Sequence, residues 1–188
     1  MGETSDQKQL LRAQLRAQRQ DRLANPEFDR QLSQQLGQLC LDQNVGTVAA
    51  YFPIQSEPNI RDFLDWALAQ GIKVMLPSVA GSDLHWVYFD GMTEFGELGF
   101  EEASGQPARL ADAELIFVPA LAVDLKGNRL GKGKGYYDRA LTAVFAGRKR
   151  PKVVAVVFEN EVLLSVPTEP HDHPIDGVIT AQKLLWFS

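Results

Sequence analysis

This chain of 188 residues is 45% hydrophobic and 23% charged, which predicts one ordinary globular domain spanning residues 1–188 with a well-buried core. Its formal net charge of -5 argues against a broad nucleic-acid-binding surface, and its single cysteine, Cys40, has no partner for a disulfide or a thiolate metal site. No apolar run approaches the length of a membrane span and the first residues lack the regions of a signal peptide, so we expect a cytoplasmic protein without membrane contact, and we expect a monomer.

Residues 6–23 contain no helix breaker and are rich in Gln, Leu, Arg and Ala, which predicts a long N-terminal helix. Four basic residues recur along one stripe of this helix: Lys8, Arg12, Arg16 and Arg19. The apolar face beside them, Leu11 and Leu15, is thin. Taken alone, the stripe is as consistent with a solvated face as with a binding site. A second helix is predicted over residues 27–41.

The first predicted strand, residues 45–52, ends in an apolar run that indicates burial on both faces, as in a parallel sheet. A turn-rich link follows it, and residues 60–70 form the next predicted helix. Ligands of open α/β sheets bind beyond the carboxyl ends of the strands, so Glu57 in this link is well placed for a site residue. Capping of the following helix is an equally good interpretation of Glu57.

Further strands are predicted at residues 72–76, 84–89, 115–118, 152–158 and 177–180. The first two are joined by a turn at residues 81–83, which predicts a hairpin. Residues 91–112 contain several glycines and are predicted to be an irregular covering loop. Strands interleaved with helices predict an α/β fold, namely a mostly parallel, doubly wound three-layer sandwich with an N-terminal helical extension.

Residues 127–139, called the glycine-rich segment below, concentrate positive charge in an acidic chain. Between Arg129 and Arg139, glycines and lysines alternate as Gly131, Lys132, Gly133, Lys134 and Gly135. Glycine lets the backbone approach a ligand closely, and the N-terminus of the helix predicted over residues 136–146 would face the same spot. The segment therefore predicts a phosphate cradle, although its spacing matches neither a P-loop nor a dinucleotide fingerprint. A mobile surface loop with solvated lysines is the alternative.

Near the C-terminus, His171, Asp172 and His173 raise the question of a metal site. A zinc site would need a third protein ligand at a matching spacing, and the sequence offers none nearby. We therefore favour Asp172 as a hard oxygen ligand for Mg²⁺. His85, on a predicted strand, is not expected to act as a catalyst.

Four features together resemble the 5-formyltetrahydrofolate cyclo-ligase family, whose members are also called methenyltetrahydrofolate synthetases. They are Lys8-x-x-x-Arg12, Phe52 with Glu57, the run from Asn128 to Asp138, and His171-Asp172. The resemblance covers nearly the whole chain, and its core, Arg-Leu-Gly-x-Gly-x-Gly-Tyr-Tyr-Asp, is highly specific. The two positions between the glycines vary in the family, and both are lysine here.

The resemblance implies an ATP- and Mg²⁺-dependent conversion of 5-formyltetrahydrofolate to 5,10-methenyltetrahydrofolate, with release of ADP and phosphate. It implies that ATP is bound by Lys8, Arg12, Arg129, Leu130, Gly131, Lys132, Gly133, Lys134, Gly135, Tyr136 and Tyr137. The folate would be bound by Phe52, Glu57, Lys132, Gly133, Lys134, Gly135 and Tyr136. Phe52 would pack on the folate, and Glu57 would accept hydrogen bonds from its pterin. Lys132 and Lys134 would be catalytic, and Asp138 and Asp172 would hold Mg²⁺.

Two other classes of function stay open on the sequence. A regulatory module could keep a nucleotide or folate pocket without turnover, but it would need neither aligned metal ligands nor two loop lysines. A nucleic-acid-binding protein could use the basic N-terminal helix, but no aromatic platform accompanies that helix.

Overall fold

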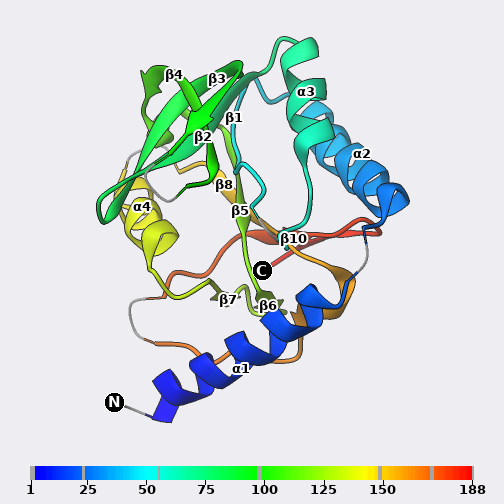
Figure 1. Cartoon of the computed structure of the whole chain (residues 1–188), viewed down its shortest axis with the longest axis vertical. Helices are drawn as coiled ribbons and strands as arrows, with labels where there is room; N and C mark the ends of the chain where they lie inside the picture. Colours follow the sequence, from blue (N-terminus) through cyan, green and yellow to red (C-terminus); the bar gives the residue numbers. More distant parts are fainter. Residues whose placement is uncertain are drawn as a thin grey trace.

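The computed structural model describes residues 3–22, 24–54, 56–96, 99–147, 150–169 and 172–187. Within these ranges, α-helices surround a large β-sheet and a small one (Figure 1). The helices are α1 (Glu3–Gln20), α2 (Pro26–Asp42), α3 (Arg61–Ala69) and α4 (Tyr136–Phe145), and short 3-10 turns occur at Leu110–Asp112 and Glu159–Glu161. None of these helices is long and apolar enough to cross a membrane.

The large sheet has eight strands in the order β11-β10-β8-β5-β1-β2-β3-β4. Its strands are β1 (Thr47–Ala49), β2 (Lys73–Ala80), β3 (Asp83–Phe95), β4 (Glu101–Ala108), β5 (Leu115–Pro119), β8 (Lys152–Val156), β10 (Gly177–Ile179) and β11 (Leu184–Trp186). The five strands from β10 to β2 run parallel, and antiparallel strands complete both edges. The predicted hairpin of β2 and β3 and the mostly parallel sheet are therefore confirmed.

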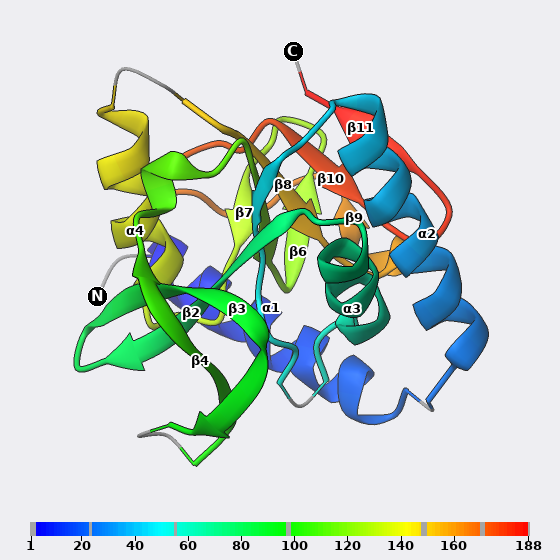
Figure 2. The same ribbon diagram turned by 90° about the horizontal axis from the view of Figure 1, so that it is seen from above.

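The buried strand β5 shows how the three layers are held together. Leu115 and Phe117 pack in the core beneath α2 and α3, whereas Ile116 and Val118 pack with α4 on the other face. Figure 2 shows α4 and the pair formed by α2 and α3 on opposite sides of the sheet. A strand buried on both faces has apolar residues in succession, as parallel strands do. The doubly wound sandwich predicted from the sequence is confirmed.

The prediction of an irregular loop over residues 91–112 is wrong for most of its length. The strand β3 continues to the residue before Gly96, and β4 pairs with it antiparallel. A Cβ atom on Gly105 would lie 2.0 Å from the carbonyl oxygen of Tyr88, and Gly91, with a φ of +96°, lies where the pairing register shifts. These glycines permit close pairing and a bulge in a long hairpin.

A second, small sheet, which was not predicted from the sequence, lies at the carboxyl end of β5. It consists of β7 (Arg129–Leu130), β6 (Ala122–Asp124) and β9 (Val162–Leu163). The helix α1 lies across this sheet (Figure 1) and buries Leu15 against Leu121, Leu130 and Val166. The N-terminal helix is therefore fixed to the edge of the domain at which the parallel strands end.

The lone thiol of the chain is sealed in the core beneath α2. Burial raises the pKa of Cys40 to about 12, because the thiolate would lose its hydration there. We expect Cys40 in the native protein to react with a disulfide reagent at pH 8 no faster than the protein unfolds, since the thiolate is the reactive form. Absorbance of the released chromophore, followed with and without denaturant, checks this; rapid reaction of the native protein would contradict it.

Candidate functional site

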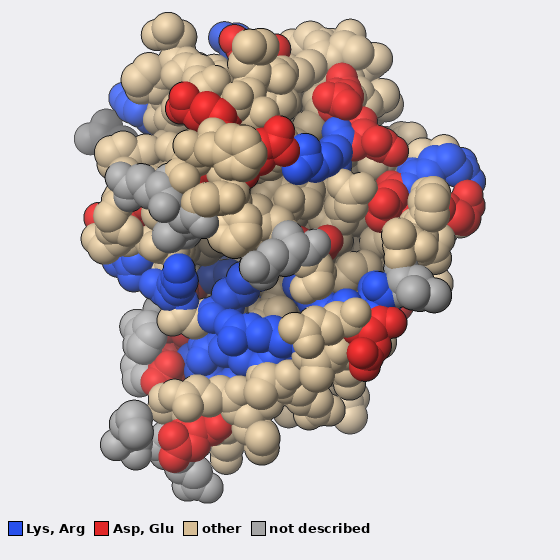
Figure 3. Space-filling model, in the orientation of Figure 1, with Lys and Arg blue, Asp and Glu red and all other residues tan. Residues whose placement is uncertain are grey.

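A cleft of about 680 Å³ opens where α1, the glycine-rich segment and the link after β1 meet. One wall carries cationic side chains, from Lys8, Arg12, Arg16, Arg129, Lys132 and Lys134. The other wall has apolar side chains, from Phe52, Ile54, Pro77, Val79, Leu84 and Phe100, and it also carries Glu101 and Glu102. Figure 3 shows the Lys and Arg side chains as a band that crosses this face of the molecule beside α1. The cleft therefore suits a ligand with an anionic end and an apolar, flat end.

The strand β5 is followed by the small hairpin of β6 and β7, and the glycines and lysines of the glycine-rich segment continue from β7 into the cleft. Gly133 and Gly135 have φ values of +100° and +69°, which L-residues rarely adopt. Gly135 occupies the N-cap position of α4, where no side chain caps the helix. The first N–H groups of α4 thus remain available for an anion at the cleft, as the predicted phosphate cradle requires.

Asp124 fixes the turn that leads into the glycine-rich segment. Its carboxylate accepts hydrogen bonds from the backbone nitrogens of Lys126, Asn128 and Val166, at 2.9, 3.0 and 3.0 Å, and from the Asn128 amide at 2.9 Å. Burial by itself raises the pKa of Asp124, but these hydrogen bonds outweigh it and the net pKa is lowered. Asp124 was not identified from the sequence. The signal that could have identified it is an acidic residue close to the turn-forming pair Gly127-Asn128.

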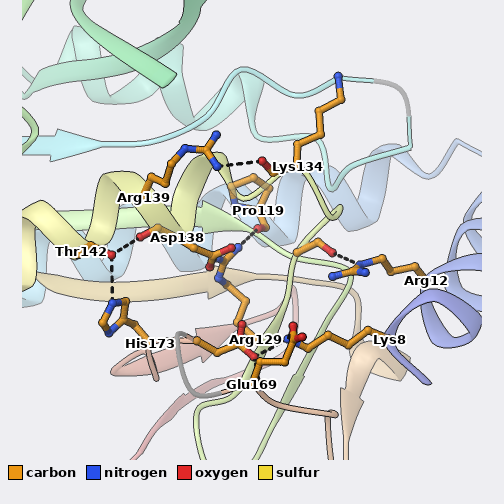
Figure 4. Close-up of polar contacts among 12 residues, drawn as sticks. Lys8, Arg12, Pro119, Arg129, Lys134, Asp138, Arg139, Thr142, Glu169 and His173 are labelled. Atoms are coloured by element: carbon orange, nitrogen blue, oxygen red, sulfur yellow. Dashed lines mark hydrogen bonds and ion pairs between the residues drawn. The ribbon is translucent and has the colours of Figure 1, made fainter. Parts of the chain in front are cut away.

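The basic stripe of α1 faces the body of the protein, so its interpretation as a solvated face is wrong. The Lys8 side chain is only 4% exposed, and its ammonium lies 2.7 Å from Glu169 and 2.5 Å from Asp172. The Arg12 side chain donates to the Gly131 carbonyl at 3.0 Å (Figure 4). The sequence left both interpretations of the stripe open, because the spacing of residues along a helix does not show what the helix packs against.

The remaining two arginines of the stripe extend these contacts along the helix. Arg16 donates to the Lys132 carbonyl at 2.7 Å and lines the cleft. Arg19 is buried and forms a two-point pair with Glu161, at 2.6 and 2.7 Å, and donates to the Ala120 carbonyl at 2.5 Å. Arg19 therefore anchors α1, whereas the other three basic residues of the stripe contact the cleft.

Arg129 connects the cradle to the start of α4. Its side chain is almost completely buried, and the guanidinium pairs with Asp138 (Figure 4). The guanidinium carbon lies 5.9 Å from the centroid of the Tyr137 ring. Its Nε has no hydrogen-bond partner among the described residues although it is buried. A buried donor without a partner is costly, so this nitrogen is a position at which a ligand acceptor would be stabilised.

Glu57 lies where the cationic and apolar walls meet. Its side chain is 5% exposed; Oε2 accepts from the Ile54 backbone nitrogen at 3.0 Å, and Oε1 lies 2.8 Å from the Lys132 ammonium. The interpretation of Glu57 as a helix cap is wrong, because α3 begins after Ile60 and receives no side-chain cap. The Tyr51 hydroxyl donates to the Pro58 carbonyl at 2.8 Å, which holds the link in shape.

Two aromatic residues of the predicted site lie near Glu57. Phe52 lies on the apolar side of the cleft, and Tyr137 lies on α4. The Phe52 ring is half-buried, edge-on to Phe89, with the Arg61 guanidinium 4.0 Å above it. Burial raises the pKa of Tyr137, and the nearby charge of Glu57 raises it further, so its hydroxyl remains protonated at every physiological pH. Arg61 was not identified from the sequence, and no motif there marks it.

The two candidate metal ligands, Asp138 and Asp172, both line the cleft. In each, the hydrogen bonds of the described residues go to a single oxygen, Oδ1 in Asp138 and Oδ2 in Asp172. Each carboxylate thus keeps one oxygen for a cation that also binds phosphate and water, a donor set that suits Mg²⁺. The described residues contain no cluster of three or more potential metal-binding side chains. Because Arg129 and Lys8 already neutralise the two aspartates, a polyphosphate would have to contribute to the affinity for the metal.

The described histidine near Asp172, His173, contacts α4 and gives no support to a zinc site. The His173 ring lies 3.1 Å from the Thr142 hydroxyl and edge-on to Phe145, so it contacts α4. His171 lies outside the described residues.

The fold and the cleft define a doubly wound α/β protein with a cation-lined site at the carboxyl edge of its sheet. Residues 4–181 match the 5-formyltetrahydrofolate cyclo-ligase family. A relative named 5-formyltetrahydrofolate cyclo-ligase, from Mycolicibacterium smegmatis, is 40% identical over 148 residues, which are 73% of this chain and 74% of the relative. A second relative of that name, from Haemophilus influenzae, is 24% identical over 93% of this chain and 98% of its own length.

Solved structures agree with these sequence comparisons. The NMR structure of the Aquifex aeolicus 5,10-methenyltetrahydrofolate synthetase superposes with a TM-score of 0.80 at 28% identity, covering 95% of this chain and 92% of the other. A 5,10-methenyltetrahydrofolate synthetase from Mycoplasma pneumoniae gives 0.74 at 21% identity, with coverage of 93% and 98%, and supports the fold. The chain belongs to the 5-formyltetrahydrofolate cyclo-ligase family. The prediction of an enzyme of the ligase class is thereby confirmed.

Proposed function

We propose that this protein closes 5-formyltetrahydrofolate to 5,10-methenyltetrahydrofolate at the expense of ATP, which leaves as ADP and phosphate. The observation that carries the proposal is the junction at Glu57, where a single cleft joins a cationic phosphate cradle to an apolar wall. The cradle suits the polyphosphate of ATP, and the apolar wall suits the flat pterin of the folate. Family membership supports the same substrate and product.

The chemistry explains why the two kinds of wall must meet. The formyl group on N5 is an amide, too weak an electrophile for the aromatic amine N10. Transfer of the γ-phosphoryl group to the formyl oxygen makes that oxygen a leaving group and releases ADP. The N10 lone pair then attacks the formyl carbon, the C–O bond breaks to release phosphate, and N10 loses its proton. The protein's part is to align the formyl oxygen with the phosphate and to stabilise charge there.

The residues of the cleft divide this work. Lys8, Arg12 and Arg129 lie where they can bind the polyphosphate, with Lys132 and Lys134 on the transferred group. The Glu57 carboxylate accepts hydrogen bonds from N–H groups of the pterin, and Phe52 packs on its face. The backbone and the wall of the cradle come from the other residues of the segment, namely Leu130, Gly131, Gly133, Gly135, Tyr136 and Tyr137.

The assay for this function mixes the protein with 5-formyltetrahydrofolate, ATP and Mg²⁺. Growth of the absorbance of the conjugated methenyl product, with ADP formed in equal amount, is the expected result. Reactions that lack ATP, or that contain its non-hydrolysable analogue, are the controls. ATP consumption without the new chromophore would contradict the proposal.

Asp138 and Asp172 are the residues that would hold Mg²⁺, which supplies positive charge to the phosphate oxygens when bound. We expect Asp138→Asn and Asp172→Asn each to lower kcat by about 10²-fold or more, because metal charge stabilisation is worth several kcal/mol. Initial rates over a Mg²⁺ titration measure this, and raised Mg²⁺ should restore part of the rate. Asp65→Asn, an exposed change on α3, is the matched control. Parental rates in both site variants at ordinary Mg²⁺ would remove the assignment.

We also propose that the protein acts as a monomer in the cytoplasm. The cleft is lined on both walls by residues of one chain, so no second copy is needed to complete it. Light scattering behind a sizing column tests the monomer, and a stable dimer at assay concentration would contradict it.

A further inference from the structure

One ion pair joins the two walls of the cleft. The Lys132 ammonium, on the glycine-rich segment, lies 2.8 Å from Oε1 of Glu57, which belongs to the link after β1. The lysine side chain is 37% exposed and the glutamate side chain is 5% exposed. Under the proposed function these two groups serve different substrates. Lys132 binds the phosphate of ATP, and Glu57 binds the pterin.

The buried carboxylate cannot give up its partner without a replacement. Among the contacts of the described residues, Oε2 of Glu57 is satisfied by the Ile54 nitrogen and Oε1 by Lys132 alone. A buried carboxylate that loses its charged partner without a replacement is strongly disfavoured. A pterin that donates an N–H group to Oε1 of Glu57 offers such a replacement, and it competes with Lys132 for that oxygen.

The lysine, by contrast, can leave without disturbing its backbone. Arg16 holds the Lys132 carbonyl at 2.7 Å and Arg12 holds the Gly131 carbonyl at 3.0 Å, so α1 fixes the main chain on which Lys132 stands. The side chain is partly exposed and flexible. Within the described part of the chain, Glu57 is its ion-pair partner. Once released from Glu57, the Lys132 ammonium can bind a phosphate in the cradle, which lines the same cleft.

We propose that folate binding displaces Lys132 from Glu57 and thereby releases this lysine to the phosphate of ATP. This inference rests on the proposed function. The two substrates bind with positive coupling, each raising the affinity for the other by the same factor. The pair Glu57–Lys132 carries the coupling, and Lys134, which has no ion-pair partner among the described residues, does not. Without folate, the enzyme holds one of its two loop lysines away from the phosphate.

Binding measurements without turnover test the coupling directly. A non-hydrolysable ATP analogue with Mg²⁺ is titrated into the protein by calorimetry, with and without saturating 5-formyltetrahydrofolate. We expect folate to tighten analogue binding by about tenfold in the parent, within the usual range of coupling between sites. In Lys132→Met the ratio is expected to fall to about one. In Lys134→Met, the matched control, the ratio is expected to stay near that of the parent.

Replacing the Glu57 carboxylate is expected to strengthen binding of the ATP analogue, whereas replacing a loop lysine is not. Glu57→Gln releases Lys132 without folate, so the analogue is expected to bind the folate-free variant several-fold more tightly than the folate-free parent. A general loss of negative charge near the phosphate would have the same sign, so the change is repeated in the Lys132→Met background. We expect no gain there, because the lysine that carries the effect is absent.

Three outcomes overturn the inference. They are a ratio of one in the parent, a parental ratio in Lys132→Met, and an equal gain from Glu57→Gln in both backgrounds. Thermal melts of each variant confirm that the titrated protein is folded. Failure of the proposed function is separate, because it would appear as absence of methenyl product from the parent with ATP. If the parent forms product but shows no coupling, only the displacement of Lys132 is contradicted and the proposed function stands.

Discussion

Lys134→Met is expected to lower kcat by about 10²-fold or more while the KM for folate changes little, the pattern of a group that acts mainly in the transition state. The residue stands between the two left-handed glycines of the cradle. Arg139 donates to its carbonyl at 3.2 Å, which fixes the backbone, and its side chain extends away from Arg129 and Lys8 (Figure 4). Among the described residues, no carboxylate lies within ion-pair distance of it. Its charge is therefore available for a phosphoryl group without the breaking of an existing pair.

Steady-state rates with each substrate varied in turn measure this effect. Lys132→Met is the informative comparison, because its charge is shared with Glu57 in the absence of substrates. Lys126→Met, an exposed change in the turn before the glycine-rich segment, is the control and should leave both constants unchanged. Parental kcat in both Lys132→Met and Lys134→Met would mean that the lysines of the segment are merely solvated.

The central sheet was accessible from the sequence because its strands are locally distinct. Runs such as residues 115–118 and 152–158 are apolar and β-branched, and a strand buried on both faces must be so. The β3–β4 hairpin was missed because its strands carry polar residues and glycines, and they are held by pairing between distant positions. Gly105 is the clearest case, since a residue that usually marks a loop is here required by the approach of another backbone.

The candidate site was predicted in its parts but not in its connections. The glycine-rich segment stood out because glycine and lysine alternate within a few residues. The partners of Lys8, by contrast, are 161 and 164 residues away, at Glu169 and Asp172, and no local pattern identifies them. The same holds for the ion pair of Lys132 with Glu57. A sequence shows which side chains can carry charge, and the fold determines which of them meet.

Arg12→Ala is expected to abolish most of the stabilisation that Mg-ATP gives the parent. A ligand at about 100 times its dissociation constant stabilises a protein by about 2.7 kcal/mol, which corresponds to a rise in Tm of roughly 5–10 °C for a chain of this size. Arg12 contributes one hydrogen bond to the folded protein, to the Gly131 carbonyl, and it lines the cleft. Its removal should therefore change the melting temperature of the ATP-free protein by no more than about 2 °C.

Lys8→Ala should differ from Arg12→Ala in the ATP-free state, although both variants are expected to lose the response to ATP. Lys8 is buried against Asp172 and Glu169. Its loss leaves two carboxylates close together without the cation between them, so the ATP-free melting temperature should fall. Thermal melts of the parent, each single variant and the double variant, with and without Mg-ATP, separate the two effects. An ATP-induced shift as large in Arg12→Ala as in the parent would place the polyphosphate away from α1, and the basic stripe would then serve only to hold the helix on the domain.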